Sequence, residues 1–223
     1  MRIVAVGGPK GGVGKTTTAV TLAAVACRAG LSVLLVDSDR NRSATDWAES
    51  CGDRLGIDLA DGQDTGDLAR LRAAGGYDLA VVDLPGARAG GFETILTGNN
   101  GATPTADLLL APTPAETMDL RPTLRVLRGE VAPLRLDYLC VFTRVPSYGL
   151  PRARQQAEVL DAAGVRIART VIRTYTCYNL ALDNGQTILD LPATGSAERA
   201  QQDYYALARE VFTAAGLHAK VNP

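Results

Sequence analysis

Histidine is almost absent from this sequence, and its cysteines form no motif. The only histidine in 223 residues is His218, close to the C-terminus. The four cysteines are far apart and include no C-x-x-C pair: Cys27, Cys51, Cys140 and Cys177. These absences argue against a cysteine/histidine zinc site, an iron–sulfur cluster and histidine-based catalysis. We expect reduced, mostly buried thiols, as in a cytoplasmic protein.

The sequence also lacks long apolar runs and a strong net charge. No run approaches the roughly 18 apolar residues of a membrane helix, and the N-terminus leads directly into a predicted strand, so we expect neither a membrane span nor a signal peptide. The net charge of −1 excludes a molecule-wide attraction to nucleic acid or membrane. At this length, we expect one α/β domain spanning residues 1–223.

Lysine is scarce as well, and its placement is informative. Only three lysines occur, and two of them lie in the stretch Lys10-Gly11-Gly12-Val13-Gly14-Lys15-Thr16-Thr17. An apolar run, residues 3–6, precedes this stretch, and a helix-forming run, residues 18–29, follows it. Strand, glycine-rich loop and helix form the context of a phosphate-binding loop. We therefore predict that residues 10–17, called the phosphate-binding loop below, bind ATP.

The residue types in this loop suit a polyphosphate. Glycine carries no Cβ and can take positive φ, so successive N–H groups can turn inward, and the helix that follows adds its positive end. We expect the Lys15 ammonium to meet the β and γ oxygens and the Thr16 hydroxyl to ligate Mg²⁺. The predicted ATP-binding residues of the loop are Lys10, Gly11, Gly12, Val13, Gly14, Lys15, Thr16 and Thr17.

Two apolar runs end in aspartate. Residues 33–36 lead into Asp37-Ser38-Asp39, and residues 79–82 lead into Asp83 in a Walker B pattern. An acidic residue at the carboxyl end of a parallel strand points into the crevice where ligands bind. We expect Asp83 to bond a water on Mg²⁺. For Asp37 and Asp39, the alternative is that they only end a strand and cap the next helix.

The loop departs from the standard G-x-x-x-x-G-K-[ST] pattern, because Pro9 replaces the first glycine and Lys10 follows it. It resembles the deviant Walker A motif K-G-G-x-G-K-[ST] of the ParA/MinD superfamily. In that family the extra lysine reaches across a dimer interface to the partner's nucleotide. Residues 37–47 resemble the segment D-x-D-P-Q-x-S-x-x-x-W of small ParA-type proteins, although Arg40-Asn41 replaces Pro-Gln. The resemblance covers nearly the whole chain and is strongest in the first 90 residues.

The resemblance implies specific roles. Lys10, Lys15 and Asp39 would be catalytic, with Asp39 orienting the attacking water, and Asp37 would join Thr16 and Asp83 around Mg²⁺. Thr143 and Arg144 stand where the family usually carries a residue pair that meets the nucleotide base. We also assign Arg173, at the end of the next predicted strand, to the nucleotide.

The implied function is that of a partition or cargo-positioning ATPase. Such a protein binds ATP and Mg²⁺, forms a homodimer around two nucleotides and coats non-specific DNA, and a centromere-binding or cargo adaptor protein stimulates hydrolysis. We therefore expect a cytoplasmic protein that associates with the nucleoid when ATP is bound.

The arginines are unevenly distributed in a way that suits DNA. Residues 121–173 contain ten arginines and four acidic residues, so a local positive face is expected despite the acidic pI. For each arginine, a solvated surface position is the alternative. The predicted DNA-binding residues are Arg152, Arg154, Arg169 and Arg173.

Two other functions fit the same loop. A MinD-type membrane ATPase would end in a basic amphipathic helix, for which residues 216–223 are too short and too mixed. An ATP-dependent biosynthetic ligase of the dethiobiotin synthetase or amidoligase kind needs a pocket for a carboxylated substrate and no dimer-bridging lysine. Lys10 therefore favours the partition ATPase.

The pattern of apolar runs predicts the fold class. Roughly seven runs alternate with helices, which indicates a single doubly wound, mostly parallel α/β sheet flanked by helices. We expect an edge strand at residues 55–59. For residues 87–105 we expect a loop with a short helix around residues 92–96.

Overall fold

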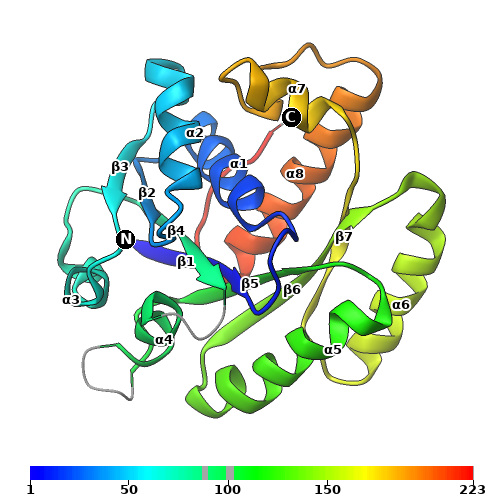
Figure 1. Ribbon diagram of the computed structural model, residues 1–223, viewed down its shortest axis with the longest axis horizontal. Helices are drawn as coiled ribbons and strands as arrows, with labels where there is room; N and C mark the ends of the chain where they lie inside the picture. Colours follow the sequence, from blue (N-terminus) through cyan, green and yellow to red (C-terminus); the bar gives the residue numbers. More distant parts are fainter. Residues whose placement is uncertain (87–89, 99–102, 223) are drawn as a thin grey trace.

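The computed structural model describes residues 1–86, 90–98 and 103–222. Its centre is a sheet of seven strands in the order β3-β2-β4-β1-β5-β6-β7, and each neighbouring pair runs parallel (Figure 1). The strands are β1 (Arg2–Gly8), β2 (Val33–Asp37), β3 (Asp58–Asp61), β4 (Leu79–Gly86), β5 (Leu108–Thr113), β6 (Asp137–Val145) and β7 (Ile167–Arg173). The single, doubly wound parallel sheet predicted from the sequence is confirmed.

Helices cover both faces of the sheet. They are α1 (Lys15–Arg28), α2 (Ser43–Cys51), α3 (Thr65–Ala69), α4 (Gly90–Thr97), α5 (Thr117–Val126), α6 (Leu150–Ala162), α7 (Cys177–Asp183) and α8 (Gly195–Ala214). Side chains alternate along each strand. Val4 and Val6 of β1 therefore face the layer of α1, α2, α7 and α8, whereas Ile3 and Ala5 face α3 to α6. Both faces are apolar, as a buried parallel sheet requires.

Several local predictions differ from the structure. The edge strand expected at 55–59 is present as β3 at the edge of the sheet, but it begins later, at Asp58, because residues 52–55 form a 3₁₀ turn. Gly56, at φ +62°, turns the chain between them. Helix α4 is longer than expected, and the rest of the predicted 87–105 loop lies partly outside the described residues. The short α7 was not predicted, because seven residues give little periodicity.

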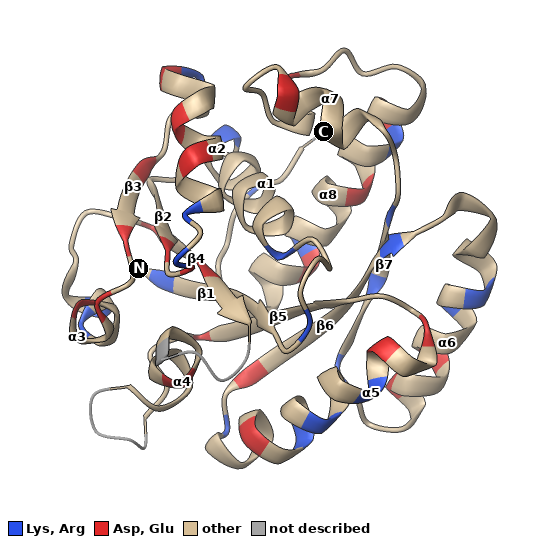
Figure 2. Cartoon of the chain, viewed as in Figure 1, with Lys and Arg blue, Asp and Glu red and all other residues tan. Residues whose placement is uncertain are grey.

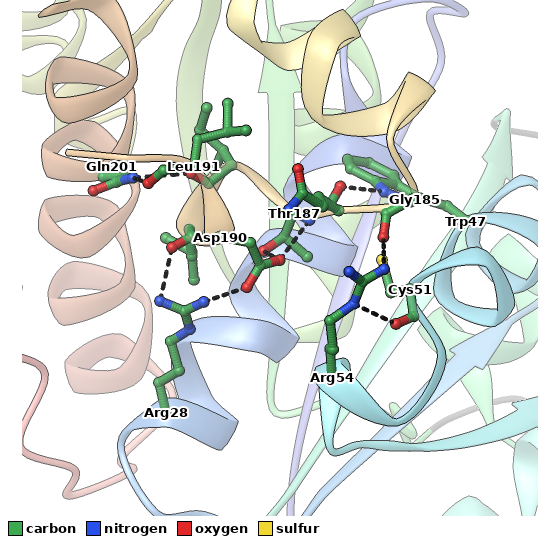
Figure 3. A network of polar contacts seen from close by, with 12 residues as sticks. Arg28, Trp47, Cys51, Arg54, Gly185, Thr187, Asp190, Leu191 and Gln201 are labelled. Carbon is green, nitrogen blue, oxygen red and sulfur yellow. Dashed lines mark hydrogen bonds and ion pairs between the residues drawn. The ribbon is translucent and has the colours of Figure 1, made fainter. Parts of the chain in front are cut away.

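The segment between α7 and α8, residues 184–194, joins three other parts of the molecule (Figure 3). Arg28 at the end of α1 donates to the carbonyl of Leu189 and the carboxylate of Asp190. The Trp47 indole of α2 donates to the Gln186 carbonyl at 2.9 Å. Arg54, just after α2, donates to the Gly185 carbonyl at 2.9 Å. The end of α1, the middle of α2 and the turn after α2 are thus anchored to one segment.

No helix within the three described ranges combines the length and apolar character needed to cross a bilayer.

Candidate nucleotide-binding site

The phosphate-binding loop joins β1, near the middle of the sheet, to α1. Gly12 and Gly14 take φ values of +69° and +89°, which side chains rarely adopt. Gly14 is the N-cap of the 14-residue α1, and neither a capping side chain nor an acidic residue covers the first turn. The open N–H groups and the positive end of this helix therefore form an anion site.

Both loop lysines have partners within the protomer. The Lys15 ammonium donates to the carbonyl of Lys10 at 3.1 Å, so it folds back over the loop. The Lys10 ammonium forms an ion pair with Asp119 in the first turn of α5. Both side chains of this pair are partly exposed. The structure thus places both predicted lysines at the loop and shows a partner for Lys10 that the motif does not contain.

Asp83 is buried next to the start of α1. Its Oδ2 accepts from the Thr16 hydroxyl at 2.7 Å, and its Oδ1 has no partner among the described residues. Burial raises the pKa of Asp83 from the ordinary 3.8 to about 7, and nearby Asp37 acts in the same direction, whereas the Thr16 hydrogen bond opposes it. An unsatisfied buried oxygen is the kind of group that a metal-bound water satisfies.

Asp37 is the register neighbour of Asp83 across β2 and β4. Its Oδ1 accepts from the N–H of Asp39 at 3.0 Å, and its Oδ2 accepts from the N–H and hydroxyl of Thr45. It therefore holds the turn that carries Asp39 and satisfies the first turn of α2, which is the capping role that the sequence left open.

These side chains fit Mg²⁺ without forming a closed metal cage. Within the described residues, no group of three or more histidine, cysteine or acidic side chains gathers around one point. Mg²⁺ usually keeps several waters and takes one or two carboxylates together with substrate phosphates. Thr16 and the free oxygen of Asp83 suit that arrangement.

Asp39 follows the buried end of β2 and is partly exposed. Its Oδ1 accepts from the N–H of Asn41 at 3.0 Å, which closes a local turn. Within the described residues, no side chain donates a hydrogen bond to this carboxylate, so a ligand can reach it. Its catalytic role stays a prediction.

Thr143 and Arg144, at the end of β6, contact the phosphate-binding loop. The Thr143 hydroxyl donates to the carbonyl of Val13 at 2.8 Å, and the Arg144 guanidinium donates to the carbonyl of Gly12. Thr143 is buried, and Arg144 takes φ +56°. The contact with the nucleotide base that the resemblance implies for this pair stays a prediction.

The predicted DNA-binding arginines lie at the β7 edge of the sheet. Arg154, Arg169 and Arg173 line a shallow groove of about 240 Å³ between α6, β7 and α8, and Arg152 is exposed on α6. Arg173 is already engaged, because its Nε and a terminal nitrogen donate to Asp203 at 2.9 and 2.7 Å. Hydrogen bonds from this guanidinium to the carboxylate raise the pKa of Arg173.

Charge is unevenly distributed over the molecule (Figure 2). Basic positions outnumber acidic ones over residues 121–173, with ten arginines and four acidic residues, whereas acidic positions outnumber basic ones over α2, β3 and α3 at the other edge of the sheet. The net charge of −1 therefore conceals an uneven distribution of the two signs.

The glycine-rich loop between β1 and α1, with Thr16 bonded to a buried Asp83 at the adjacent strand end, defines a P-loop nucleotide-binding protein of the doubly wound α/β class. The chain belongs to the CobQ/CobB/MinD/ParA nucleotide-binding family, whose model matches residues 4–188. Within that family it is a ParA/MinD-type ATPase.

Similar proteins agree with this assignment. The chain is 37% identical over 211 residues to "Maintenance of carboxysome distribution protein A" of Gloeobacter kilaueensis, with 94% of each chain covered. It is 34% identical over 153 residues to the chromosome-partitioning ATPase Soj of Thermus thermophilus, covering 62% of this chain and 56% of Soj.

Solved structures share the fold. The MinD cell division protein of Aquifex aeolicus superposes with a TM-score of 0.73 at 20% identity, with 100% of each chain covered. The ATP complex of Cyanothece McdA superposes with a TM-score of 0.70 at 20% identity, covering 100% of this chain and 99% of that one.

Proposed function

We propose that this protein is a positioning ATPase that hydrolyses ATP with Mg²⁺ and acts as a nucleotide-dependent homodimer on non-specific DNA. The observation that carries the proposal is the loop itself. Lys10 begins the loop, and Lys15 stands at the open helix N-terminus beside Thr16 and the unpartnered oxygen of Asp83.

In this proposal, each site residue either neutralises charge on the phosphates or orients a reacting group. The loop amides and the Lys15 ammonium hold the β and γ phosphates and neutralise the charge that develops on them. Thr16 and Asp83 would hold Mg²⁺, directly or through its waters, and the ion would supply further neutralisation. Asp39, at the end of β2, orients the attacking water, and Asp37 holds the backbone of Asp39 in place.

Lys10 would act on the partner's nucleotide. Its side chain is partly exposed and reaches from the start of the phosphate-binding loop to α5. Two chains that meet at the carboxyl ends of their strands would bring each Lys10 to the other's phosphates, so dimerisation would depend on ATP.

The DNA and cargo parts of the proposal rest on charge and on relatives. Two dimer-related copies would double the basic field of the β7 edge. The relatives are named for carboxysome distribution and for chromosome partition, so positioning of a cargo is the shared function that we propose. A separate adaptor protein on the cargo would stimulate hydrolysis.

The decisive test is ATP binding and turnover by wild type and Lys15→Ala. Removing the ammonium should weaken Mg²⁺–ATP binding about 10- to 100-fold, since a hydrogen bond to a charged group contributes about 1.5–3 kcal/mol. Lys220→Ala is the matched control, because Lys220 is the only lysine outside the loop and is exposed. Equal ATP affinity in Lys15→Ala and wild type, measured by titration calorimetry, would contradict the assignment of this loop.

A further inference from the structure

Two carbonyl groups of the phosphate-binding loop are held from a distant strand. The hydroxyl of Thr143 bonds the Val13 carbonyl, and the guanidinium of Arg144 bonds the Gly12 carbonyl. β6 does not pair with β1, since β5 lies between them. These bonds therefore link the loop that follows β1 to β6, a strand with which β1 forms no backbone hydrogen bonds.

The direction of these carbonyls determines the direction of two amides. A trans peptide group is planar, and its C=O and N–H point in opposite directions. The described residues contain no cis peptide bond. When the carbonyls of Gly12 and Val13 point toward β6, the N–H groups of Val13 and Gly14 must point the other way. Neither N–H has an acceptor among the described residues.

The backbone conformation of Arg144 and the burial of Thr143 both cost free energy, which indicates that the surrounding fold imposes these positions. Arg144 is one of three non-glycine residues at positive φ among those described, and such strain persists only where the surroundings impose it. Thr143 is 2% exposed, so its hydroxyl has no access to bulk water. Without the Val13 carbonyl, this hydroxyl would be left unsatisfied.

We propose that Thr143 and Arg144 are positioning residues of the phosphate site. They turn the amides of Val13 and Gly14 toward the polyphosphate instead of reading the nucleotide base. This inference rests on the proposed ATPase function, because it assigns the pair to the same bound ATP. Its distinctive consequence is that the base should not matter: polyphosphate alone should respond to changes in the pair as ATP does.

The experiment compares three probes in the presence of excess Mg²⁺: ATP, GTP and inorganic tripolyphosphate. Each is titrated by calorimetry into wild type, Thr143→Val, Thr143→Ser and Arg144→Ala. Thr105→Val is the matched control for Thr143, because Thr105 is 4% exposed and its hydroxyl also donates to a backbone carbonyl, that of Thr94. Arg135→Ala controls for Arg144, since Arg135 is an exposed arginine with nearly the same φ of +55°, just before the start of β6.

Thr143→Val should weaken all three probes by the same factor, about 5- to 100-fold, as expected when a buried hydrogen bond is removed. Thr143→Ser should restore binding, because it keeps the hydroxyl. Arg144→Ala should lower the three affinities in parallel by a smaller factor, since its side chain is exposed. The two controls should leave all three affinities unchanged, even where they lower the melting temperature.

Two results would overturn the proposal. The first is a Thr143→Val variant that binds tripolyphosphate as tightly as wild type but binds ATP more weakly, or that changes the ratio of the ATP and GTP affinities. Either outcome would assign Thr143 and Arg144 to the nucleotide base. The second is unchanged affinity for all probes.

A measurement without ligand separates this proposal from the proposed function. NMR order parameters of the Val13 and Gly14 N–H groups should fall in nucleotide-free Thr143→Val and stay at wild-type values in Thr105→Val. If wild type binds none of the probes, the ATPase proposal fails. The order parameters then still decide whether Thr143 orients the loop: a fall supports that role and unchanged values refute it.

Discussion

The ammonium of Lys10 lies in an ion pair with the carboxylate of Asp119, 109 residues further along the chain. Asp119 stands in the first turn of α5, which follows β5, the neighbour of β1 in the sheet. In the proposed dimer, Lys10 has to leave this carboxylate to reach the partner's nucleotide. The ion pair within the protomer therefore competes with dimerisation.

The first prediction concerns this competition. Asp119→Asn should lower the ATP concentration needed for half-maximal dimerisation by up to about fivefold, because partly exposed ion pairs contribute up to about 1 kcal/mol. Light scattering with increasing ATP measures the effect. Asp137→Asn, which breaks the exposed pair with Arg166, is the control. A higher or unchanged ATP requirement in Asp119→Asn would show that the pair does not oppose assembly.

The second prediction concerns the attacking water. Asp39→Ala should bind ATP with an affinity close to that of wild type and hydrolyse it at least about 100-fold more slowly, because general-base and positioning groups typically contribute about 10²–10⁴-fold. The ATP-bound dimer should then persist in light scattering. Asp46→Ala removes an exposed carboxylate from the following helix and should turn over normally. Wild-type turnover in Asp39→Ala would remove Asp39 from the mechanism.

The third prediction concerns the pH dependence of folding stability. The pKa of Asp83 is raised from 3.8 to about 7, mainly by burial, so between these values the folded state binds this proton more tightly than the unfolded state. The contribution of protonated Asp83 to the free energy of unfolding is fully present below about pH 4 and is lost as pH rises through about 7. The difference between the two pKa values corresponds to about 4 kcal/mol.

Asp83→Asn should remove this dependence. Compared with wild type in EDTA and without nucleotide, its free energy of unfolding should improve steadily from pH 4 to pH 7 and stay constant above that. Urea denaturation at several pH values provides the measurement, with Asp46→Asn as a surface control. A difference between the variant and wild type that does not change with pH would refute the assignment of a raised pKa to Asp83.

The fourth prediction concerns DNA. With ATP and Mg²⁺, the protein should bind duplex DNA without sequence preference. Replacing Arg154 and Arg169 with alanine should flatten the log–log salt dependence by about 0.9 for each phosphate that the variant no longer neutralises. ATP affinity should not change. A smaller effect is expected for Arg173→Ala, because Asp203 already holds that guanidinium.

Fluorescence anisotropy from about 50 to 200 mM salt measures these slopes. An Arg70→Ala/Arg72→Ala variant is the control, since it removes the same charge from the segment before β4. Tight DNA binding by the nucleotide-free protein, or an unchanged slope in the Arg154/Arg169 variant, would contradict this placement of the DNA surface.

The sequence alone determined the fold class and the phosphate-binding loop. Both depend on residues that are close together in the chain: apolar runs of strand length separated by helical periods, and two lysines among glycines within eight residues. Aspartates at strand ends were also predictable, because parallel strands bring their carboxyl ends to one edge. Asp37 and Asp83 are register neighbours for this reason.

The tertiary structure decided which distant groups meet these residues. Asp119 reaches Lys10, Thr143 and Arg144 hold the loop carbonyls, and Asp203 engages Arg173. These partners lie 30 to 132 residues apart in the chain. Local patterns carry no information about such pairs, because they depend on the order in which strands are placed in the sheet. Only the packing of the strands into one sheet brings the carboxyl ends of β5 and β6 next to the phosphate-binding loop.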